Sequence, residues 1–533
     1  MKKGIVYYSF IVLTIFMFSS CEPGIVIEKP DVYKLEIEEL SKKTKAPSLQ
    51  SFVHGVSGDE WLLFAGRTNQ KNDNGGLHNI DGDYADTSFP PTTFNDKIFV
   101  YNLKNDSKVS ITLNDLKQIL KTNFPKNAAA LEGFEHVFRN SNSLVKQKGD
   151  FLFVVGGYGP KDFNASSKKI GNYITYNHVA RIHVPSLISL VNGNYDAVDK
   201  AQLFAFGRDK TNTLVSTGGE LHTVDGTFYL VMGHCFGTNC TPFQKYVDAT
   251  YPFTVLVDTS KTANNIHKLN ISISNAISDV SDPKGAAADN MSVFRRRDGP
   301  IVPALFKSPV SNKIQEGIAV YSGVFKAGND ENLQAWNDAI YIHPNFANQE
   351  SRLYTYDKTY NQKNYNVYAS PSFVMYNADK EMTHTYILGG IGDGKSAKNG
   401  NLSGFTNTGM RIDTKITTNF KNNTTITSTN KIISENIYLN KDKNDKPFYG
   451  AEAILFPNSN LKVVEISNGK NSKGQEKAPT ITEVFDMSKF DGEKIIIGHI
   501  FGGIEAFESN PASYGPKKSR ASNKIWKVTL KKQ

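Results

Sequence analysis

The feature that most constrains this chain is a short apolar run that ends in glycine and recurs along its length. In Gly149–Gly159, GDFLFVVGGYG, large apolar and β-branched residues follow a turn and stop at two adjacent glycines. An apolar run of this length, bounded by glycine, predicts a buried β-strand. The same plan recurs at Trp61–Arg67, Gly226–His234, Glu316–Gly323, His384–Gly392 and Glu493–Gly503. Recurrence of one strand unit predicts a repeat architecture.

Each glycine strand has further expected strands on both sides. The preceding ones are expected at Gln50–His54, Glu135–Arg139, Glu220–Val224, Ser292–Arg296, Ser372–Tyr376 and Ala451–Phe456. The following ones are expected at Lys97–Leu103, His178–Val184, Phe253–Val257, Ala339–His343, Lys431–Leu439 and Lys524–Leu530. Small antiparallel sheets repeated around an axis form a β-propeller. We therefore expect an all-β ring that closes through Lys524–Leu530 against the first blade, which leaves no sheet edge exposed.

The glycine doublets resemble those of the kelch family. The doublet is complete in Phe151–Gly157, Tyr386–Gly390 and Ile500–Gly503, whereas the other copies keep one glycine at Gly66, Gly233 and Gly323. The resemblance spans about Ser51–Leu530 and implies a kelch-like β-propeller of six blades. Seven blades would require a degenerate blade in Ile391–Tyr449, where Asn399–Ser428 is either a long decorated loop or one more hairpin.

The N-terminus has the plan of an export signal. Met1-Lys2-Lys3 precedes the apolar run Ile5–Phe18, and small residues lead to Cys21. This order predicts a secretory signal, and the run is short for a transmembrane helix. The cysteine after small residues resembles a bacterial lipobox, which implies cleavage before Cys21 and a diacylglyceryl group attached to its sulfur through a thioether, with palmitate among the acyl chains. The alternative is a plain signal peptide with an incidental cysteine.

These features divide the chain into three parts. We expect a lipoprotein signal peptide at 1–20, an acylated N-terminus and polar tether at 21–47 with a short helix in Tyr33–Lys42, and the propeller at 48–533. The formal net charge is +9, but lysines are scattered among acids, so we expect a solvated basic surface and no nucleic-acid partner. The lipobox and the composition favour a lipid-anchored envelope protein of a Gram-negative outer membrane, and they leave the oligomeric state open.

Two cysteines remain in the exported part. Cys235 and Cys240, in HCFGTNC, are close in sequence and predict a disulfide in an oxidising compartment. The alternative is a metal site with His234 as a third ligand. No cofactor is expected, although Asp81–Asp86 has oxygen ligands at alternate positions and suggests a structural Ca²⁺ site.

Ligands of a propeller are expected at the axis or on the loops over one face. The polar residues expected beside the inner strands are His54, Glu135, His136, Glu220, His222, Arg295, Arg296, Arg297 and Asp298, and Arg67 and His78 follow the first glycine strand. The arginine run favours a carboxylate or phosphate, because guanidinium groups bind these anions through two hydrogen bonds. Alternatively, these arginines face solvent or form internal salt bridges.

The expected function is binding of a glycan or an envelope protein. The alternative is a carbohydrate-active enzyme resembling kelch-type sialic-acid epimerases, with arginine, glutamate and histidine lining an axial channel. The sequence contains no Gly-x-Ser-x-Gly turn, which a serine hydrolase would require. Glu135, Glu220, Glu452 and Glu505 carry carboxyl groups that could act on a glycoside, but the sequence singles out no pair. No catalytic residue is therefore assigned.

Replacing Cys21 with serine tests the anchor. We expect the Cys21→Ser variant to lose incorporation of labelled palmitate and to leave the membrane fraction, because thioether and acyl attachment need the sulfur. Retention of the label would contradict the lipobox interpretation. A Cys240→Ser variant is the control and should keep the label.

Overall fold

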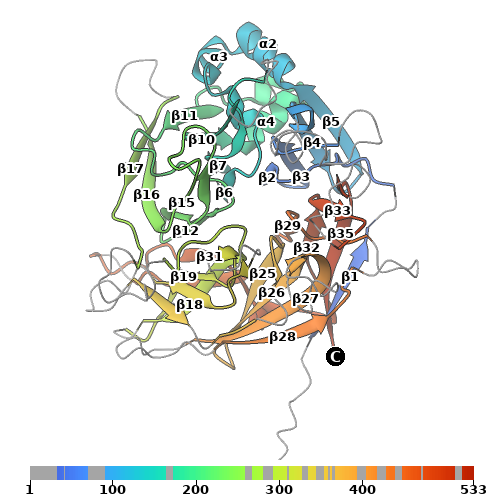
Figure 1. The fold of residues 1–533 in the computed structure, drawn as a ribbon, viewed down its shortest axis with the longest axis vertical. Helices are drawn as coiled ribbons and strands as arrows, with labels where there is room; N and C mark the ends of the chain where they lie inside the picture. Colours follow the sequence, from blue (N-terminus) through green and yellow to red (C-terminus); the bar gives the residue numbers. More distant parts are fainter. Residues whose placement is uncertain are drawn as a thin grey trace, which may run out of the picture.

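The computed structural model describes residues 33–40, 43–69, 91–163, 172–258, 267–279, 292–308, 311–326, 334–343, 353–357, 360–362, 367–392, 404–416, 428–438, 447–469, 472–509 and 519–533. Its larger sheets surround a central axis (Figure 1) and are antiparallel except for one strand pair. The chain is therefore an all-β propeller, as the sequence predicts. Cys21, His78 and Asp81–Asp86 lie outside the described residues.

Five sheets have four strands each. The first contains β2 (Val53–Ser57), β3 (Glu60–Phe64), β4 (Lys97–Asn102) and β5 (Ser107–Thr112). The second contains β6 (Leu144–Lys148), β7 (Phe151–Val155), β10 (His178–His183) and β11 (Phe204–Arg208). The third contains β12 (Glu220–Val224), β13 (Thr227–Val231), β16 (Thr250–Val257) and β17 (Leu269–Ile273). The fourth contains β18 (Ile301–Lys307), β19 (Ile314–Val320), β22 (Ala339–Ile342) and β23 (Tyr354–Asp357). The last contains β29 (Ile454–Pro457), β32 (Lys494–Phe501), β35 (Ile525–Lys532) and β1 (Tyr33–Glu39).

The remaining large sheet has seven strands. It contains β25 (Ser372–Asn377), β26 (Met382–Gly392), β27 (Gly404–Lys415), β28 (Ser428–Ser434), β24 (Val367–Tyr368), β30 (Val463–Ile466) and β31 (Thr480–Asp486). The β30–β31 hairpin is inserted between β29 and β32, and β31 pairs in parallel with β25. The prediction of six like blades, or seven, is therefore wrong: five sheets are regular four-stranded blades, and the β26 glycine strand belongs to a larger sheet. No glycine strand marks the inserted hairpin in the sequence.

Short elements decorate the strands. Two-stranded hairpins are formed by β8 (Tyr158–Pro160) with β9 (Tyr173–Thr175), β14 (His234–Phe236) with β15 (Gln244–Tyr246), β20 (Val324–Lys326) with β21 (Gln334–Ala335), and β33 (Ile504–Ala506) with β34 (Ser519–Ala521). The helices are α2 (Leu113–Asn123), α3 (Pro125–Leu131) and α4 (Val184–Val191), with 3-10 turns η1 (Pro91–Thr93), η2 (Glu135–Phe138), η4 (Tyr195–Ala197) and η7 (Met487–Lys489). Helix α2 begins at a capping box, in which Thr112 Oγ1 accepts from the Asp115 N–H at 3.1 Å.

Several expected strands are corrected by the structure. Glu135–Arg139 is largely the 3-10 turn η2, and Ser292–Arg296 contains no strand. In both repeats the inner strand begins several residues later, at Leu144 and Ile301. The arginine and histidine runs in these segments form the turn or loop that leads to the inner strand. In the large sheet the strand after the glycine strand is β27, so Asn399–Ser428 contains part of a hairpin completed by β28.

The expected helix in Tyr33–Lys42 is instead strand β1. Tyr33 pairs with Lys532 and Glu39 with Trp526 in an antiparallel ladder along β35. The last strand therefore pairs with the N-terminal strand, which forms the outer edge of the last sheet, and not with a strand of the first blade. Alternating charged and apolar residues in YKLEIEE suit a half-buried edge strand, and Ile37 is the buried member.

The glycine ends of the recurring strands connect neighbouring sheets. In five of the six repeats the N–H of the second glycine, or its single-glycine equivalent, donates to a carbonyl that precedes the next inner strand. These bonds join Gly66 to Asn140 (2.7 Å), Gly157 to Ser216 (3.0 Å), Gly233 to Arg296 (2.9 Å), Gly390 to Tyr449 (3.1 Å) and Gly503 to Leu49 (2.8 Å). The last bond joins the C-terminal sheet to the chain just before the first one, and so completes the circle.

In two of the three repeats that keep one glycine, the missing one is replaced by a residue in the same left-handed conformation, Ala65 or Met232. Gly156 and Gly157 have φ values of 65° and 95°, and Met232 and Gly233 have 58° and 90°. An ideal Cβ on Gly157 would lie 2.4 Å from Ser143 Oγ, and one on Gly233 would lie 2.4 Å from Ser216 Oγ. The second position therefore requires glycine for space as well as for backbone conformation.

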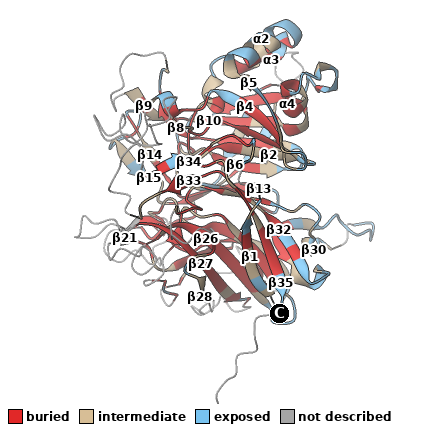
Figure 2. Cartoon of the chain, turned by 90° about the vertical axis from the view of Figure 1, so that its right-hand side faces the viewer, coloured by how far each residue is buried: buried red, intermediate tan, exposed pale blue. Residues whose placement is uncertain are grey.

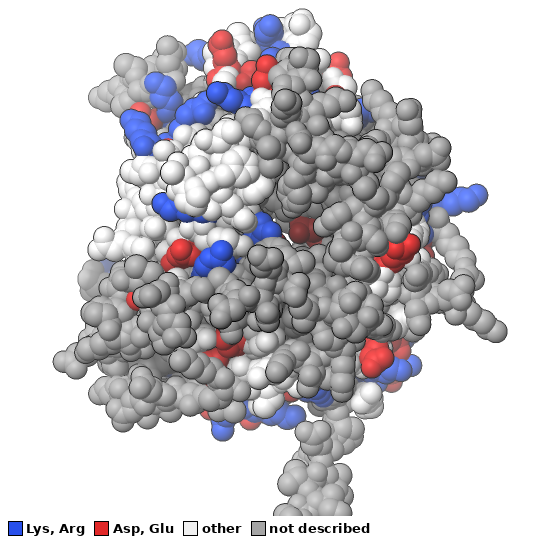
Figure 3. Space-filling view, viewed as in Figure 1, with Lys and Arg blue, Asp and Glu red and all other residues white. Residues whose placement is uncertain are grey.

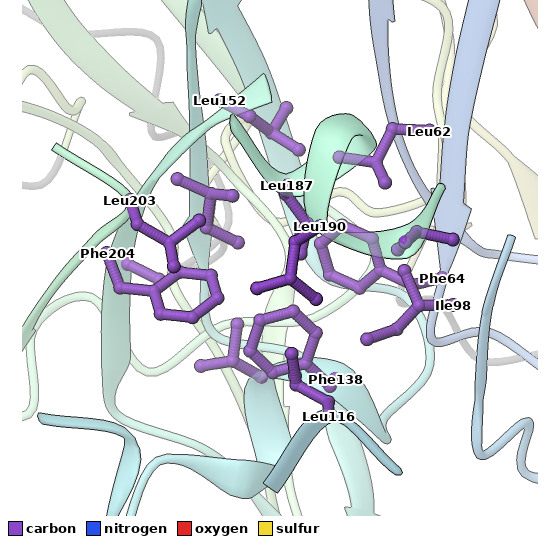
Figure 4. Close-up of a cluster of buried hydrophobic side chains, with 14 of the residues drawn as sticks. Leu62, Phe64, Ile98, Leu116, Phe138, Leu152, Leu187, Leu190, Leu203 and Phe204 are labelled. Atoms are coloured by element: carbon purple, nitrogen blue, oxygen red, sulfur yellow. The ribbon is translucent and has the colours of Figure 1, made fainter. Parts of the chain in front are cut away.

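The strands consist largely of buried residues (Figure 2), and apolar side chains of adjacent sheets pack together in shared clusters. Between the first and second blades, helix α4 inserts Leu187 and Leu190 among Leu62, Phe64 and Phe138 (Figure 4). All five side chains are almost fully buried. This packing holds the inner strands rigidly around the axis, where their leading loops meet.

Adding a methyl group at Gly503 should weaken the ring. Gly503 has φ +80°, and its Cβ would lie 2.4 Å from the Ala451 carbonyl oxygen. We expect Gly503→Ala to lower the free energy of unfolding by roughly 3 kcal/mol or more, since left-handed strain and a backbone clash add. Gly193→Ala is the matched control: φ is +79° and no atom lies within 4 Å, so only about 1 kcal/mol should be lost. Equal losses in denaturant unfolding would contradict this account.

Candidate functional site

One backbone position recurs just before each inner strand and has a positive φ. We call these residues the axial ring: Ser51, Asn142, Gly218, Asp298, Ala369 and Glu452, with φ values between 49° and 66°. Backbone N–H groups donate from one member to the carbonyl of the preceding one, from Asn142 to Ser51 (3.2 Å), Asp298 to Gly218 (2.8 Å), Ala369 to Asp298 (2.7 Å) and Glu452 to Ala369 (2.8 Å). Left-handed backbone at non-glycine residues costs free energy and is concentrated at functional sites.

The carboxyl group of Glu452 connects several members of the axial ring. Its Oε2 accepts from Ser51 Oγ at 2.7 Å and from Asn142 Nδ2 at 3.3 Å. Glu452 precedes the last sheet and Asn142 precedes the second, with the first sheet between them. Side chains from sheets that are not neighbours meet only near the axis. All six members of the axial ring are half-buried, as expected for residues at the mouth of a channel.

Further polar side chains lie deeper along the inner strands. Glu220 is two residues beyond the ring member Gly218, or about 7 Å along a strand. His222 and Lys146 are each four residues beyond a ring member, or about 13 Å. At that depth Lys146, from β6, forms an ion pair with Glu483 of the inserted strand β31. The β31 strand therefore reaches across the axis, and the pair marks a second polar level beneath the axial ring.

Glu220 is surrounded by protein atoms but remains accessible to water. The side chain is exposed, yet burial among protein atoms raises the pKa of Glu220 to about 7, with the charge of Glu452 acting in the same direction and Lys146 against it. Channel water moderates this effect because it solvates the charged form. Because its side chain is exposed to water and yet has protein atoms around it, Glu220 lines a channel.

The pKa values of two neighbouring carboxyl groups, Glu452 and Asp298, are also raised. Burial raises the pKa of Glu452 to about 7, with the charge of Asp298 adding to the rise and the Ser51 hydrogen bond, Arg67 and Arg297 opposing it. Burial also raises the pKa of Asp298, against the opposing charge of Arg297. Arg297 Nε lies 3.4 Å from Asp298 Oδ2. Figure 3 shows a recess near the middle of the molecule, with acidic side-chain atoms at depth and basic ones beside them.

The three arginines of the 295–297 run have different roles. Arg296 is almost fully buried; it pairs with Asp338 at 2.5 Å, donates to the Ser322 carbonyl at 3.2 Å and lies over Trp336. Arg295 lies over the ring of Tyr246, 3.9 Å from its centroid. Arg297 alone belongs to the axial site, where it donates to His234 Nε2 at 2.9 Å beside Asp298. Arg295 and Arg296 are thus held by partners within the protein, as in the alternative of internal contacts for this run.

Other predicted residues also separate into two groups. His54 packs between the rings of Phe52 and Phe456, and burial lowers its pKa to about 4. Glu135 pairs with Lys117 at 3.4 Å on the outer part of the second repeat. His136 contacts the Lys161 carbonyl at 3.1 Å near Tyr176. All three lie away from the axial carboxyl groups, because His54 on β2 faces the last sheet and the other two lie on turn η2, which precedes the inner strand.

The predicted residues that do reach the site are Arg67, Glu220, His222 and Arg297. Arg67 is buried, donates from Nε to Gln50 Oε1 at 2.9 Å and contributes positive charge near Glu452. His222 contacts the Ile301 carbonyl at 3.1 Å, and burial, reinforced by the charge of Lys146, lowers its pKa to about 4. Arg67 thus adds positive charge beside the carboxyl groups, whereas His222 is uncharged at neutral pH.

Sequence reasoning missed Ser51, Asn142, Lys146 and Glu483, and did not select Glu452 from other glutamates. The recurring signal was available, because each axial-ring residue stands two or three residues before its inner strand. It could be found only once the inner strands were placed correctly. Glu483 had no comparable signal, since the insertion that carries it crosses to another sheet.

Cys235 and Cys240 form the predicted disulfide. The bridge closes the turn of the β14–β15 hairpin, and its formation removes the thiolates that a metal site with His234 would need. Across the described ranges, no group of three or more His, Cys, Asp and Glu side chains is arranged to hold a metal ion. In the same part of the chain, no helix combines the length and apolar character needed to span a membrane.

Comparisons with known proteins add little beyond the architecture. No protein-family model matches the chain, and no curated protein sequence matches it. A solved structure titled "Structure of YjhT" aligns over 92% of this chain and 98% of its own, with 10% identity and a TM-score of 0.37. This similarity is too low to transfer any site or activity. The propeller assignment therefore depends on the sheets themselves.

The raised pKa values predict a pH dependence of stability. Glutamate ionises at 4.5 in its ordinary state, whereas Glu220 and Glu452 ionise at about 7 in the fold. Between these values the folded protein holds more protons than the unfolded chain, so the free energy of unfolding decreases as pH rises. This contribution is complete below pH 4.5 and lost as pH passes about 7.

We expect Glu452→Gln to flatten this decrease, measured as the melting temperature between about pH 5 and about pH 8. Glutamine keeps the shape of the side chain but cannot ionise. Glu132→Gln, at the exposed end of α3, is the control and should leave the profile unchanged. A parallel profile for wild type and Glu452→Gln would show that Glu452 ionises normally.

Proposed function

We propose that the propeller binds a polyhydroxylated ligand, a glycan, at its axial site. The observation that carries this proposal is the convergence of Asp298 and Glu452, with Ser51 and Asn142, at the channel mouth, and of Glu220 just below them. Carboxylates accept hydrogen bonds from sugar hydroxyls, and amide and guanidinium groups donate to them. A concave site with a few converging polar groups and displaced pKa values is typical of ligand binding.

The charge balance favours a neutral glycan over a sugar acid. Arg67 and Arg297 lie beside the carboxyl cluster, but Arg296 is engaged with Asp338 and Arg295 with Tyr246. Two guanidinium groups facing three carboxyl groups leave no excess of positive charge for an anionic ligand. Hydroxyl groups bind such a mixed surface without burying an additional unpaired charge.

Acid–base catalysis on that glycan is the second candidate. Glu220 and Glu452 have pKa values of about 7, where a carboxyl group can both donate and accept a proton at neutral pH. Protonated and ionised carboxyl groups in one site are the pattern of acid–base pairs. This candidate gives Glu220 and Glu452 the proton-transfer role and Asp298 with Arg297 a positioning role.

The remaining part of the proposal concerns location. We place the propeller at the bacterial envelope, held to the outer membrane through an acylated Cys21, as the lipobox-like sequence implies. Residues between Cys21 and Tyr33 would then connect the lipid to β1 at the outer edge of the last blade. A glycan or glycosylated envelope partner would be available there.

Calorimetry with full-length protein tests the binding proposal. We expect a neutral oligosaccharide within a panel of neutral, amino and acidic sugars to bind, and Glu452→Gln to weaken that binding by about tenfold or more, because a hydrogen bond to a charged group is lost. Glu132→Gln is again the control. Turnover of the bound sugar that disappears in Glu220→Gln would identify the enzyme.

The contrary outcomes are equally specific. Preferential binding of sugar acids would contradict the charge argument. Binding of a neutral sugar with unchanged affinity in Glu452→Gln would place the ligand elsewhere. The absence of binding to any sugar would remove the glycan proposal and leave a protein partner as the alternative.

A further inference from the structure

A second cavity, of about 430 Å³, lies away from the axis on one face of the seven-stranded sheet. Its floor consists of two cross-strand rows. In one row Met375, His384, Asp413 and Thr429 are direct neighbours on β25, β26, β27 and β28, and in the adjacent row Tyr386 pairs with Arg411 and then Lys431. Residues two apart on a strand share a face, so these side chains form one surface. The volume is in the range of small-molecule sites.

A buried ionic cluster occupies the middle of this floor. Asp413 receives a hydrogen bond from His384 Nδ1 at 2.6 Å and from Arg411 Nη2 at 2.7 Å. Burial alone would raise the pKa of Asp413, but these hydrogen bonds outweigh it and lower the pKa. The ionised Asp413 thus fixes the hydrogen on Nδ1 of His384, which directs Nε2 to other partners. His384 and Arg411 are each about one-tenth exposed or less.

The walls of the cavity complete its chemistry. Tyr33 of β1, Met382 and Met487 provide apolar surface, and Lys380 lies at the turn between β25 and β26. Basic side chains lining the cavity are Lys380, His384, Arg411 and Lys431, and Asp413 is its single acidic residue. Flexible thioether side chains adapt to ligands of different shapes. The cavity is therefore electropositive at one part and apolar at another.

We propose that this cavity, which we call the Met–His pocket, binds a small organic anion with an apolar body. The anionic group lies against Arg411, His384 and Lys431, and the apolar body contacts Met375, Met382, Met487 and Tyr33. An internal salt-bridge network alone would not need a cavity of this size beside three methionines. The inference is independent of the axial site, because none of its residues belongs to the axial ring.

Methyl NMR of full-length protein labelled at methionine tests the proposal, with 3-phenylpropionate as the probe. The chain has eight methionines. We expect the methyl signals of Met375, Met382 and Met487 to shift on titration, whereas Met232 and Met410, which do not line the pocket, remain in place. The neutral analogue 3-phenylpropanol should shift them far less at equal concentration.

Variants separate the ionic contribution from the apolar one. Arg411→Gln should weaken binding by about tenfold and Lys431→Gln by about threefold, since the latter is exposed. Lys415→Gln, on the same strand as Arg411 but outside the lining, should bind as wild type does. Unchanged Met232 and Met410 signals verify that each variant is folded. The proposal is overturned if the pocket signals do not shift at about 10 mM probe, a concentration far above the Kd of a specific site. It is also overturned if the alcohol binds as tightly as the acid.

Discussion

The structure depends on one repeated backbone hydrogen bond, in which the N–H of a glycine at the end of one strand donates to the carbonyl before the next inner strand. Each bond fixes the spacing of two neighbouring sheets near the axis, where side chains have no room to adjust. The close approach requires that no Cβ be present at Gly157, Gly233 or Gly503. The bond from Gly503 to Leu49 is decisive, because it joins the two ends of the propeller.

This constraint also determines the position of the functional residues. Once the glycine bonds set the spacing, the loops that enter the inner strands converge and adopt left-handed backbone at the axial ring. The side chains of Ser51, Asn142, Asp298 and Glu452 are thereby presented to the axis by rigid, hydrogen-bonded backbone. Burial and mutual repulsion then raise the pKa values of the carboxyl groups. The backbone geometry that closes the propeller therefore also brings the carboxyl groups together and raises their pKa values.

Sequence patterns predicted the glycine strands well and the site poorly. All six recurring glycine strands are strands in the structure, because a long apolar run and a terminal glycine are both local signals. The inserted β30–β31 hairpin could not be predicted, since its pairing with β25 joins distant segments. The same limit explains the site: Arg296 and Arg297 are adjacent in sequence, yet one is held by Asp338 in the interior and the other meets Asp298 at the axis. Which neighbour each side chain reaches is decided by tertiary contacts.

The proposed axial site is tested most directly by titrating its carboxyl groups while infrared difference spectra of wild type, Glu220→Gln and Glu452→Gln are recorded. Carboxylate signals should titrate at about 7 in wild type and lose intensity in each variant. If the signals removed by these substitutions titrate near the ordinary glutamate value of 4.5, the carboxyl groups are normally solvated and the axis is not the site proposed for it.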